Sequence, residues 1–305
     1  MSYYTDLAME ARELDPDIKG VTEEKDKKDG VEISRIDVLN DDAAKKLGKS
    51  KGRYVTLEAK DLALRPLSLF SAAAAVFADE LASILSAIAK SQSVLIVGLG
   101  NENVTPDSLG PRTVRGVYAT NHFDSAIPGA FDNKLRSVSK IAPGVLGTTG
   151  IETFDILKGI KEAVQPDLII AVDSLASRRA SRISTTIQLS NAGIEPGSGV
   201  GNLRKGLNED GLGIPVIAIG VPLVVHASTI TRDALLYIAS QAGINDSEAS
   251  IEALAKKASD EKLEDLIVTP KDIDTIVRDM SGILSEGINR ALFGSDYDEV
   301  RALSI

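Results

Sequence analysis

The sequence predicts an α/β fold, a mostly parallel sheet with helices on both faces and a glycine-rich loop or hairpin excursion. Three observations predict it. Short apolar runs of strand length alternate with longer stretches of helical period, as in sheets whose strands are joined by helices. Several runs are apolar at every position, which is typical of strands buried on both faces. The chain has 305 residues, 43% of them hydrophobic, enough for a large core.

The first part of the chain predicts a polar segment, a hairpin and a long helix. Residues Glu23–Asp29 are all charged, which predicts a solvated loop. Val31–Val38 alternates apolar and polar residues with the period of a half-buried strand. Arg53–Glu58 favours strand and is predicted to be its hairpin partner. Leu67–Lys90 predicts a helix that is interrupted by acidic residues, which suits a packed helix better than a membrane span.

The middle of the chain predicts strands and helices in alternation. Val94–Val97 is a short apolar strand, and a helix is predicted to begin near Pro111, because proline is tolerated in a first turn. Ile151–Val164 predicts a helix and Leu168–Val172 a buried strand. A further strand is predicted over Arg182–Leu189.

The last part of the chain is predicted to be mainly helical. The segment Asn191–Gly213 is rich in glycine and predicts a long loop or a β-hairpin excursion, and long loops in compact domains are often functional. Pro215–Ile219 predicts a buried strand and Thr229–Gln241 a helix. From Ser247 onward a helical tail is predicted, in which Thr269 has the spacing of an N-terminal cap with an acidic residue three positions later.

Composition excludes several classes of function. The net charge of -10 disfavours nucleic-acid binding, because such proteins usually present a basic face. The chain has no cysteine, so a disulfide scaffold, a thiol nucleophile and a thiolate metal site are excluded. The N-terminus lacks the basic and apolar regions of a signal peptide. We therefore expect a soluble intracellular protein with no membrane and no direct nucleic-acid partner.

Two aspartates at the ends of predicted strands are the main candidates for chemistry. Asp107 follows the strand Val94–Val97, and Asp173 ends the strand Leu168–Val172. Ligands of open α/β sheets gather beyond the carboxyl ends of the strands. Two carboxylates that meet there could share a proton and work as an acid–base pair.

Other motifs have structural explanations that compete with functional ones. An isolated aspartate after a strand is often a turn former or a helix cap. Gly98-Leu99-Gly100 after a strand suggests a dinucleotide fingerprint, but its third glycine is replaced by Asn103, so a tight turn is the better interpretation. His226 follows a strand and could reach the same rim as the aspartates, although a lone histidine is more often a packing residue.

Several segments resemble the germination protease family of spore-forming bacteria, which is related to the hydrogenase maturation proteases. They are spread in order over most of the chain: Asp6–Ala11, Val97–Asn101, Val104–Pro111, Ala171–Arg178 and Gly220–Pro222. The resemblance implies a maturation-protease-like fold and an endopeptidase that degrades small acid-soluble spore proteins in the spore core, a cytoplasmic compartment. It implies an atypical aspartic-type hydrolase whose catalytic residues are Asp107 and Asp173, without cofactor or metal.

The resemblance also implies a homotetramer that is made as a zymogen and activated by autoprocessing near the N-terminus. Thr5-Asp6-Leu7-Ala8 is similar to the family's substrate motif, Thr-Glu followed by Ile or Phe and then Ala. The implied cut lies between Asp6 and Leu7, so residues 1–6 would be a short propeptide within an N-terminal segment of residues 1–30. Residues 31–305 would form a single α/β peptidase domain with a helical C-terminal region.

Two alternatives stay open from the sequence. A metal-assisted peptidase would use Asp107, Asp173 and His226 as ligands and keep one coordination position open. A non-catalytic binding protein on the same fold would use the aspartates only as caps. If the enzyme recognises a glutamate in its substrate, the candidates for the pocket that binds this glutamate are Arg178, Arg179 and Arg182. A separate candidate is the Gly98–Asn101 loop, as a source of backbone N–H groups that stabilise the reaction.

Overall fold

The computed structural model describes residues 5–64, 66–88, 92–123, 135–195, 205–243, 250, 251, 253 and 266–304. Within these residues the centre of the fold is one sheet with the strand order β1-β2-β3-β7-β8-β6-β4-β5, and β9 pairs with β8. The strands are β1 Val21–Lys28, β2 Val31–Val38, β3 Gly52–Glu58, β4 Ser93–Gly98, β5 Ser137–Ile141, β6 Leu168–Ala176, β7 Thr186–Ser190, β8 Val216–His226 and β9 Ile267–Val268.

The sheet has a parallel half and an antiparallel half. Neighbours in the series β5-β4-β6-β8 are parallel, and neighbours in the series β1-β2-β3-β7-β8 are antiparallel. The predicted α/β class is therefore confirmed, but the sheet is mixed rather than mostly parallel. The connections explain this, because β1 and β2 are joined by two residues, too few for the crossover that parallel neighbours require.

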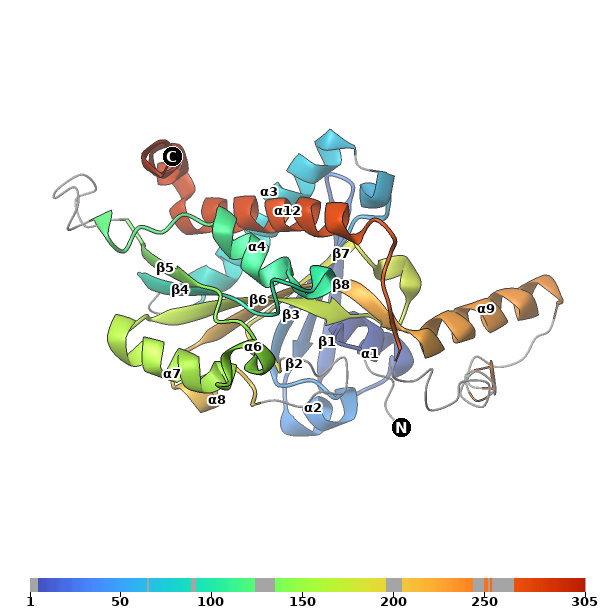
Figure 1. Cartoon of the computed structure of the whole chain (residues 1–305). Coiled ribbons are helices and arrows are strands. Elements are labelled where there is room, and N and C mark those ends of the chain that lie inside the picture. The colour runs from blue at the N-terminus through green and yellow to red at the C-terminus, as the bar shows by residue number, and fades with distance from the viewer. Residues whose placement is uncertain are drawn as a thin grey trace.

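Helices cover both faces of the sheet, as predicted (Figure 1). On one face lie α3, α4 and α12, and on the other lie α7 and α8. The α-helices are α1 Ala8–Leu14, α2 Asp41–Leu47, α3 Leu67–Ser86, α4 Leu109–Gly116, α6 Leu146–Thr149, α7 Thr153–Val164, α8 Glu209–Leu212, α9 Ala227–Gln241, α12 Ile273–Phe293 and α13 Tyr297–Leu303. Short 3₁₀ helices are η1 Lys60–Leu64, η2 Thr105–Asp107, η3 Ala180–Arg182 and η5 Gly294–Asp296.

Helix α3 belongs to the larger core, between the sheet and α12. By length and composition alone this helix could cross a membrane. In the fold, however, Phe77 and Leu81 are fully buried against α12 and the sheet. The sequence interpretation of a packed helix is thus consistent with its surroundings.

The contact between α3 and α12 depends on a glycine, and this gives a first prediction. A Cβ at Gly287 would lie 2.2 Å from Cδ1 of Phe77, whereas a Cβ at Gly282 on the same helix would meet no atom within 4 Å. We expect Gly287→Ala to lower the free energy of unfolding by about 1–3 kcal/mol through overpacking. Gly282→Ala should leave it unchanged or raise it by up to about 1 kcal/mol. Urea unfolding of both variants measures this difference, and equal effects would contradict the packing described.

Several predicted elements need correction. Glu23–Asp29 is not a loop, because most of it lies in β1, which pairs with β2 from Val21↔Val38 to Lys28↔Val31. All its residues after Val21 are exposed, so no apolar face marks it as a strand in the sequence. Thr269 does not cap α12, because its Oγ1 donates a hydrogen bond to the Leu223 carbonyl at 3.0 Å. The sequence interpretation also missed α2 and β5.

Two predicted segments fall partly outside the described residues. In the glycine-rich segment Asn191–Gly213, residues 196–204 are not described, and Ile194 and Leu207 on either side form an antiparallel bridge. This pairing agrees with the hairpin alternative. Much of the helical tail predicted from Ser247 lies outside the described residues, up to residue 265.

Candidate functional site

The turn that follows β4 packs so closely that it requires glycine. The Leu99 N–H donates to the Val172 carbonyl of β6 at 2.8 Å, which continues the β4–β6 pairing by one residue. A Cβ at Gly98 would lie 2.3 Å from the carbonyl oxygen of Gly110, so α4 could not approach the strand. Gly100 has a φ of 106°, a conformation that favours glycine. These contacts confirm the tight-turn interpretation of Gly98-Leu99-Gly100.

Asp107 lies in η2, where its carboxylate holds this turn closed. Its Oδ2 accepts a hydrogen bond from the Asn101 N–H at 2.7 Å. Its main-chain oxygen would lie 2.0 Å from a Cβ on Gly100, so turn and carboxylate are packed together. Ser108, not Asp107, is the residue that precedes α4. Asp107 is therefore a turn-closing residue, and the helix-cap alternative does not describe it.

Asp173 lies inside β6 rather than at its end. The strand continues to Ala176, four residues farther than predicted, and pairs there with β8. The side chain of Asp173 is 7% exposed, and its Oδ1 accepts a hydrogen bond from the Ser174 N–H at 2.8 Å. Because side chains alternate along a strand, Asp173 projects to the same face as Ala171, the face that α7 covers.

The two aspartates flank one turn at the carboxyl end of β4. At the end of this turn the Asp107 carboxylate accepts the N–H of Asn101. At its start Leu99 donates to the carbonyl of Val172, and Asp173 is the next residue along β6. The structure thus brings both residues to the same edge of the parallel half of the sheet, as expected for the carboxyl ends of neighbouring parallel strands.

The Gly98–Asn101 loop offers fewer free donors than predicted. The N–H groups of Leu99 and Asn101 are both bonded within the fold, to Val172 and Asp107. Backbone donors stabilise a developing oxyanion only when they point at it. The prediction of this loop as a donor source therefore fails for these two groups.

His226 is remote from the aspartates. Asp173 pairs with Gly220 across β6 and β8, and His226 lies six residues farther along β8, where it pairs with Ile267. At about 3.3 Å per residue this separation is roughly 20 Å. Among the described residues no group of three or more His, Asp or Glu side chains is arranged to hold a metal ion. The suggested ligand set of Asp107, Asp173 and His226 is therefore not assembled.

The predicted cleavage position lies beside the same strand. The Asp6 N–H donates to the Ala176 carbonyl at 3.0 Å, and Asp6 Oδ2 accepts from the Ala176 N–H at 2.8 Å. Leu7 and Ala8 are fully buried. The bond between Asp6 and Leu7 is therefore close to β6 and shielded from solvent.

A buried ionic cluster joins α1 to the region beyond β6. Arg182, 5% exposed, donates to Glu10 Oε1 at 3.0 Å and to Glu13, while Glu10 also accepts the N–H groups of Arg178 and Arg179. Burial alone would lower the pKa of Arg182, but its bonds to these carboxylates outweigh burial and raise the pKa. Arg182 is thus engaged internally and is not available for a substrate glutamate. Glu10 was not predicted as a buried site residue. The one feature that could have indicated its burial is its position among the apolar residues of this segment.

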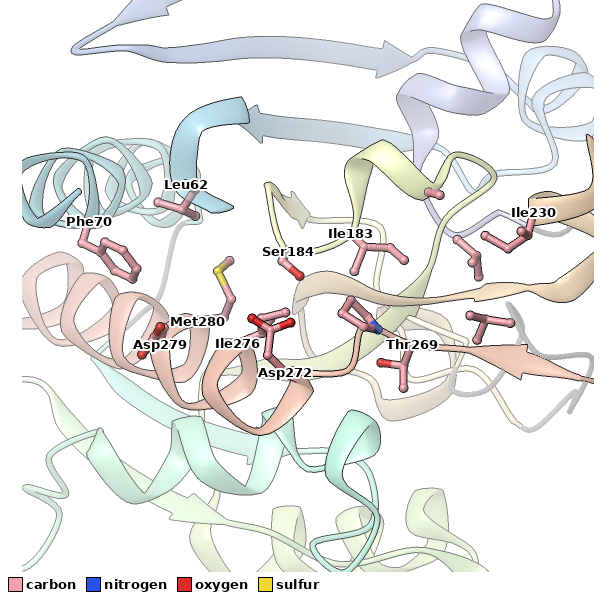
Figure 2. A pocket seen from close by; sticks show the side chains of 14 residues that line it. Leu62, Phe70, Ile183, Ser184, Ile230, Thr269, Asp272, Ile276, Asp279 and Met280 are labelled. Atoms are coloured by element: carbon pink, nitrogen blue, oxygen red, sulfur yellow. The ribbon is translucent and has the colours of Figure 1, made fainter. Parts of the chain in front are cut away.

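A cavity of about 390 Å³ lies on the opposite face from Asp173, between α12 and the end of β8 (Figure 2). Its walls are mainly apolar and include Leu62, Phe70, Ile183, Ile230, Ile276 and Met280. Val225 of β8 also lines it and shares a face with Val221 and Leu223, whereas Asp173 projects to the other side of the sheet. This cavity is therefore separate from the aspartate site.

Comparison with known proteins gives a consistent result. A family model described as germination protease matches residues 3–262. This chain belongs to the germination protease family. Relatives named germination protease come from Caldanaerobacter subterraneus subsp. tengcongensis, 45% identical over 94% of this chain and 93% of the relative, and from Clostridium perfringens, 41% identical over 94% of both chains. The one from Bacillus subtilis strain 168 is 39% identical over 94% of this chain and 92% of the relative.

Membership of the germination protease family makes the chain a peptidase with a role in spores. This agrees with the resemblance seen in the sequence. Among solved structures, a NiFe hydrogenase maturation protease from Thermococcus kodakarensis KOD1 is similar, with a TM-score of 0.34 and 12% identity, over 68% of this chain and 98% of that chain.

Proposed function

We propose that this germination protease is an endopeptidase that cleaves small acid-soluble spore proteins during germination, with Asp107 and Asp173 as the catalytic pair. The observation that carries the proposal is that both aspartates flank the turn after β4, at one edge of the sheet. The substrates, off DNA, would be extended enough to enter such a site.

The chemistry needs one ionised and one protonated carboxyl group. The ionised aspartate takes a proton from water as the water oxygen attacks the peptide carbonyl carbon. The protonated aspartate gives its proton to the carbonyl oxygen, which produces a gem-diol intermediate. As the carbon–nitrogen bond breaks, the pair gives one proton to the leaving nitrogen and takes one back from a hydroxyl of the intermediate, so it ends with the proton count it had at the start. Two carboxylates held close together favour such a shared proton, because both cannot easily ionise.

We further propose that the chain is made as a zymogen and cuts itself between Asp6 and Leu7. The surroundings of this bond give a physical reason why self-cleavage would be controlled. Leu7 is fully buried and Asp6 is bound to Ala176 through both main chain and side chain. The bond must shift within these contacts before it can reach catalytic groups, so a movement of the N-terminal segment would precede processing.

Assembly into a homotetramer and location in the spore core complete the proposal. Helix α9 extends away from the sheet and exposes apolar side chains, among them Ile230, Tyr237 and Ile238 (Figure 1). Exposed apolar groups on one element are typical of surfaces that associate.

Peptide hydrolysis tests the proposed function directly. The full chain is incubated with a peptide that contains Thr-Glu-Ile-Ala, with and without exhaustive EDTA, and mass spectrometry follows both the peptide and the protein's N-terminus. We expect a cut between Glu and Ile and loss of residues 1–6, at equal rates with and without the chelator. Loss of all cleavage on chelation would favour the metal-assisted alternative and contradict the two-aspartate proposal.

A further inference from the structure

The edge of β6 beyond the end of β4 is covered by the chain's own N-terminal segment. The last β4–β6 pair is Gly98↔Val172, but β6 continues to Ala176. On the other side β8 stays paired through this stretch, and the Ser177 N–H donates to the Val224 carbonyl. The N–H and the carbonyl of Ala176 bind Asp6 instead of a strand. Asp6 therefore occupies this part of the sheet edge through one main-chain and one side-chain hydrogen bond.

Three distant parts of the chain hold the segment in this place. Lys49 Nζ, from the loop after α2, donates to the Thr5 carbonyl at 2.8 Å. Gln188, on β7, binds the main chain on both sides of Leu7, because its Nε2 donates to the Asp6 carbonyl at 3.0 Å and its Oε1 accepts the Ala8 N–H at 2.7 Å. Ala176 on β6 supplies the third contact. Contacts from three separate elements describe a site that the fold builds around a peptide.

The chemistry of this site matches an acidic residue followed by a large apolar one. The Asp6 carboxylate accepts the N–H of Ala176 and lies in the field of Lys49. Burial lowers the pKa of Lys49, and the charge of Asp6 acts in the opposite direction. Leu7 and Ala8 are both fully buried, so the apolar and the small side chain are enclosed by the fold.

The register of the sheet brings this site near Asp173. Gln188 pairs with Gly220, and Gly220 pairs with Asp173, so the three form one row across β7, β8 and β6. Ile187 and Leu189 project to the α12 side, so Gln188 projects to the same face as Asp173. Two strand spacings separate their Cα atoms by roughly 10 Å. A peptide bond held by Gln188 therefore lies within a short movement of this carboxylate.

We propose that Lys49, Gln188 and the main chain of Ala176 form a binding site for extended peptides with an acidic residue followed by a large apolar and a small residue. In the structure the chain's own Thr5–Ala8 occupies it and competes with such peptides. The Lys49 ammonium binds the carbonyl next to the acidic position and places a positive charge there, and Gln188 binds the main chain on both sides of the apolar residue. The inference rests on the proposed function, since the peptide would be the substrate.

Binding of a labelled peptide tests the site without depending on cleavage. The probe is Thr-Glu-Ile-Ala with an N-methylated Glu–Ile bond, which keeps the carbonyl that Gln188 would bind but resists hydrolysis. Fluorescence anisotropy gives its Kd for the full chain and for Asp6→Asn. We expect Asp6→Asn to bind the probe about 10-fold more tightly, because loss of a charge-assisted hydrogen bond weakens the competing segment.

Lysine variants made in the Asp6→Asn chain test the preference for an acidic residue. Lys49→Met should weaken binding of the Glu probe about 10-fold, and binding of a Gln probe much less. Lys51→Met is the matched control, because this nearby lysine is exposed and pairs with Asp41. It should leave both Kd values unchanged. Gln188→Met, which loses the donor and the acceptor without adding a charge, should weaken both probes equally.

Two results would overturn the inference. The first is a Kd that Asp6→Asn leaves unchanged, since the segment would then not occupy the peptide site. The second is an equal loss for the Glu and Gln probes in Lys49→Met, which would make Lys49 a structural residue. Because the probe is not cleaved, a chain that binds it as expected but hydrolyses no peptide would refute the proposed function and leave the binding site standing.

Discussion

Replacement of Asp173 by asparagine is expected to lower kcat/KM for a Thr-Glu-Ile-Ala peptide by about 10²–10⁴-fold, the usual contribution of a general acid or base. Asparagine keeps the shape of the side chain, and its oxygen can still accept the Ser174 N–H that Asp173 accepts at 2.8 Å. It cannot exchange a proton with water or with the leaving nitrogen. Activity should therefore fall while the free energy of unfolding stays within about 1 kcal/mol of the parental value.

The control for this experiment lies at the other end of the same strand. Asp167 precedes β6, and its Oδ2 accepts the N–H groups of Gln92 and Ser93 at 3.0 and 2.9 Å. Asp167→Asn should cost some stability but retain parental kcat/KM, since this carboxylate is at the amino edge of the sheet. Parental cleavage by Asp173→Asn would remove Asp173 from the mechanism and favour the non-catalytic interpretation of the aspartates.

Arg182→Met is expected to cost about 3–5 kcal/mol in the free energy of unfolding. Arg182 is 5% exposed and binds Glu10, which is fully buried, so its removal leaves a carboxylate in the interior without its cationic partner. Urea unfolding at pH 7 measures the effect. Arg53→Met is the control, because the Arg53–Asp37 pair is partly exposed and such pairs contribute about 0–1 kcal/mol. Equal effects of the two variants would contradict the role of the buried cluster.

The same cluster predicts a dependence on pH. Burial alone would raise the pKa of Glu13, but the hydrogen bond and the positive charge of Arg182 outweigh burial and lower it below its ordinary value of 4.5. A lowered carboxyl pKa stabilises the fold above the unfolded pKa, and this contribution is lost as the pH falls through the folded pKa. The stability gap between the parental chain and Arg182→Met should therefore narrow as the pH falls below 4.5.

Strands with an apolar face were predictable from sequence, and strands without one were not. Val31–Val38 was predicted with its observed bounds, because its alternating apolar and polar residues indicate a strand that is buried on one face. β1 has the same backbone pairing but exposes all its residues after Val21, so its charged sequence shows no strand pattern. The mixed topology was missed because it depends on the pairing of the charged strand β1 and on the antiparallel placement of the buried strand β7, which no sequence pattern indicates.

The candidate site was predictable in part. Apolar runs located the neighbouring strands, and their carboxyl ends directed attention to Asp107 and Asp173. The contacts around them depend on register and on packing between segments that are far apart in sequence. The pairing of Gln188 with Gly220, and the reach of Lys49 to Thr5, have no periodic signal and became visible only in the fold.

The outermost strand β1 also bears on how copies of the chain can meet. A terminal strand with unpaired main-chain groups invites another sheet to extend it, and proteins resist this with charged side chains. Residues 23–28 are all acidic or basic. Lys25 forms an ion pair with Glu23, and Lys28 forms one with Asp79. A second molecule would have to strip water from these ions to dock there. This border therefore disfavours edge-to-edge stacking of copies of the chain.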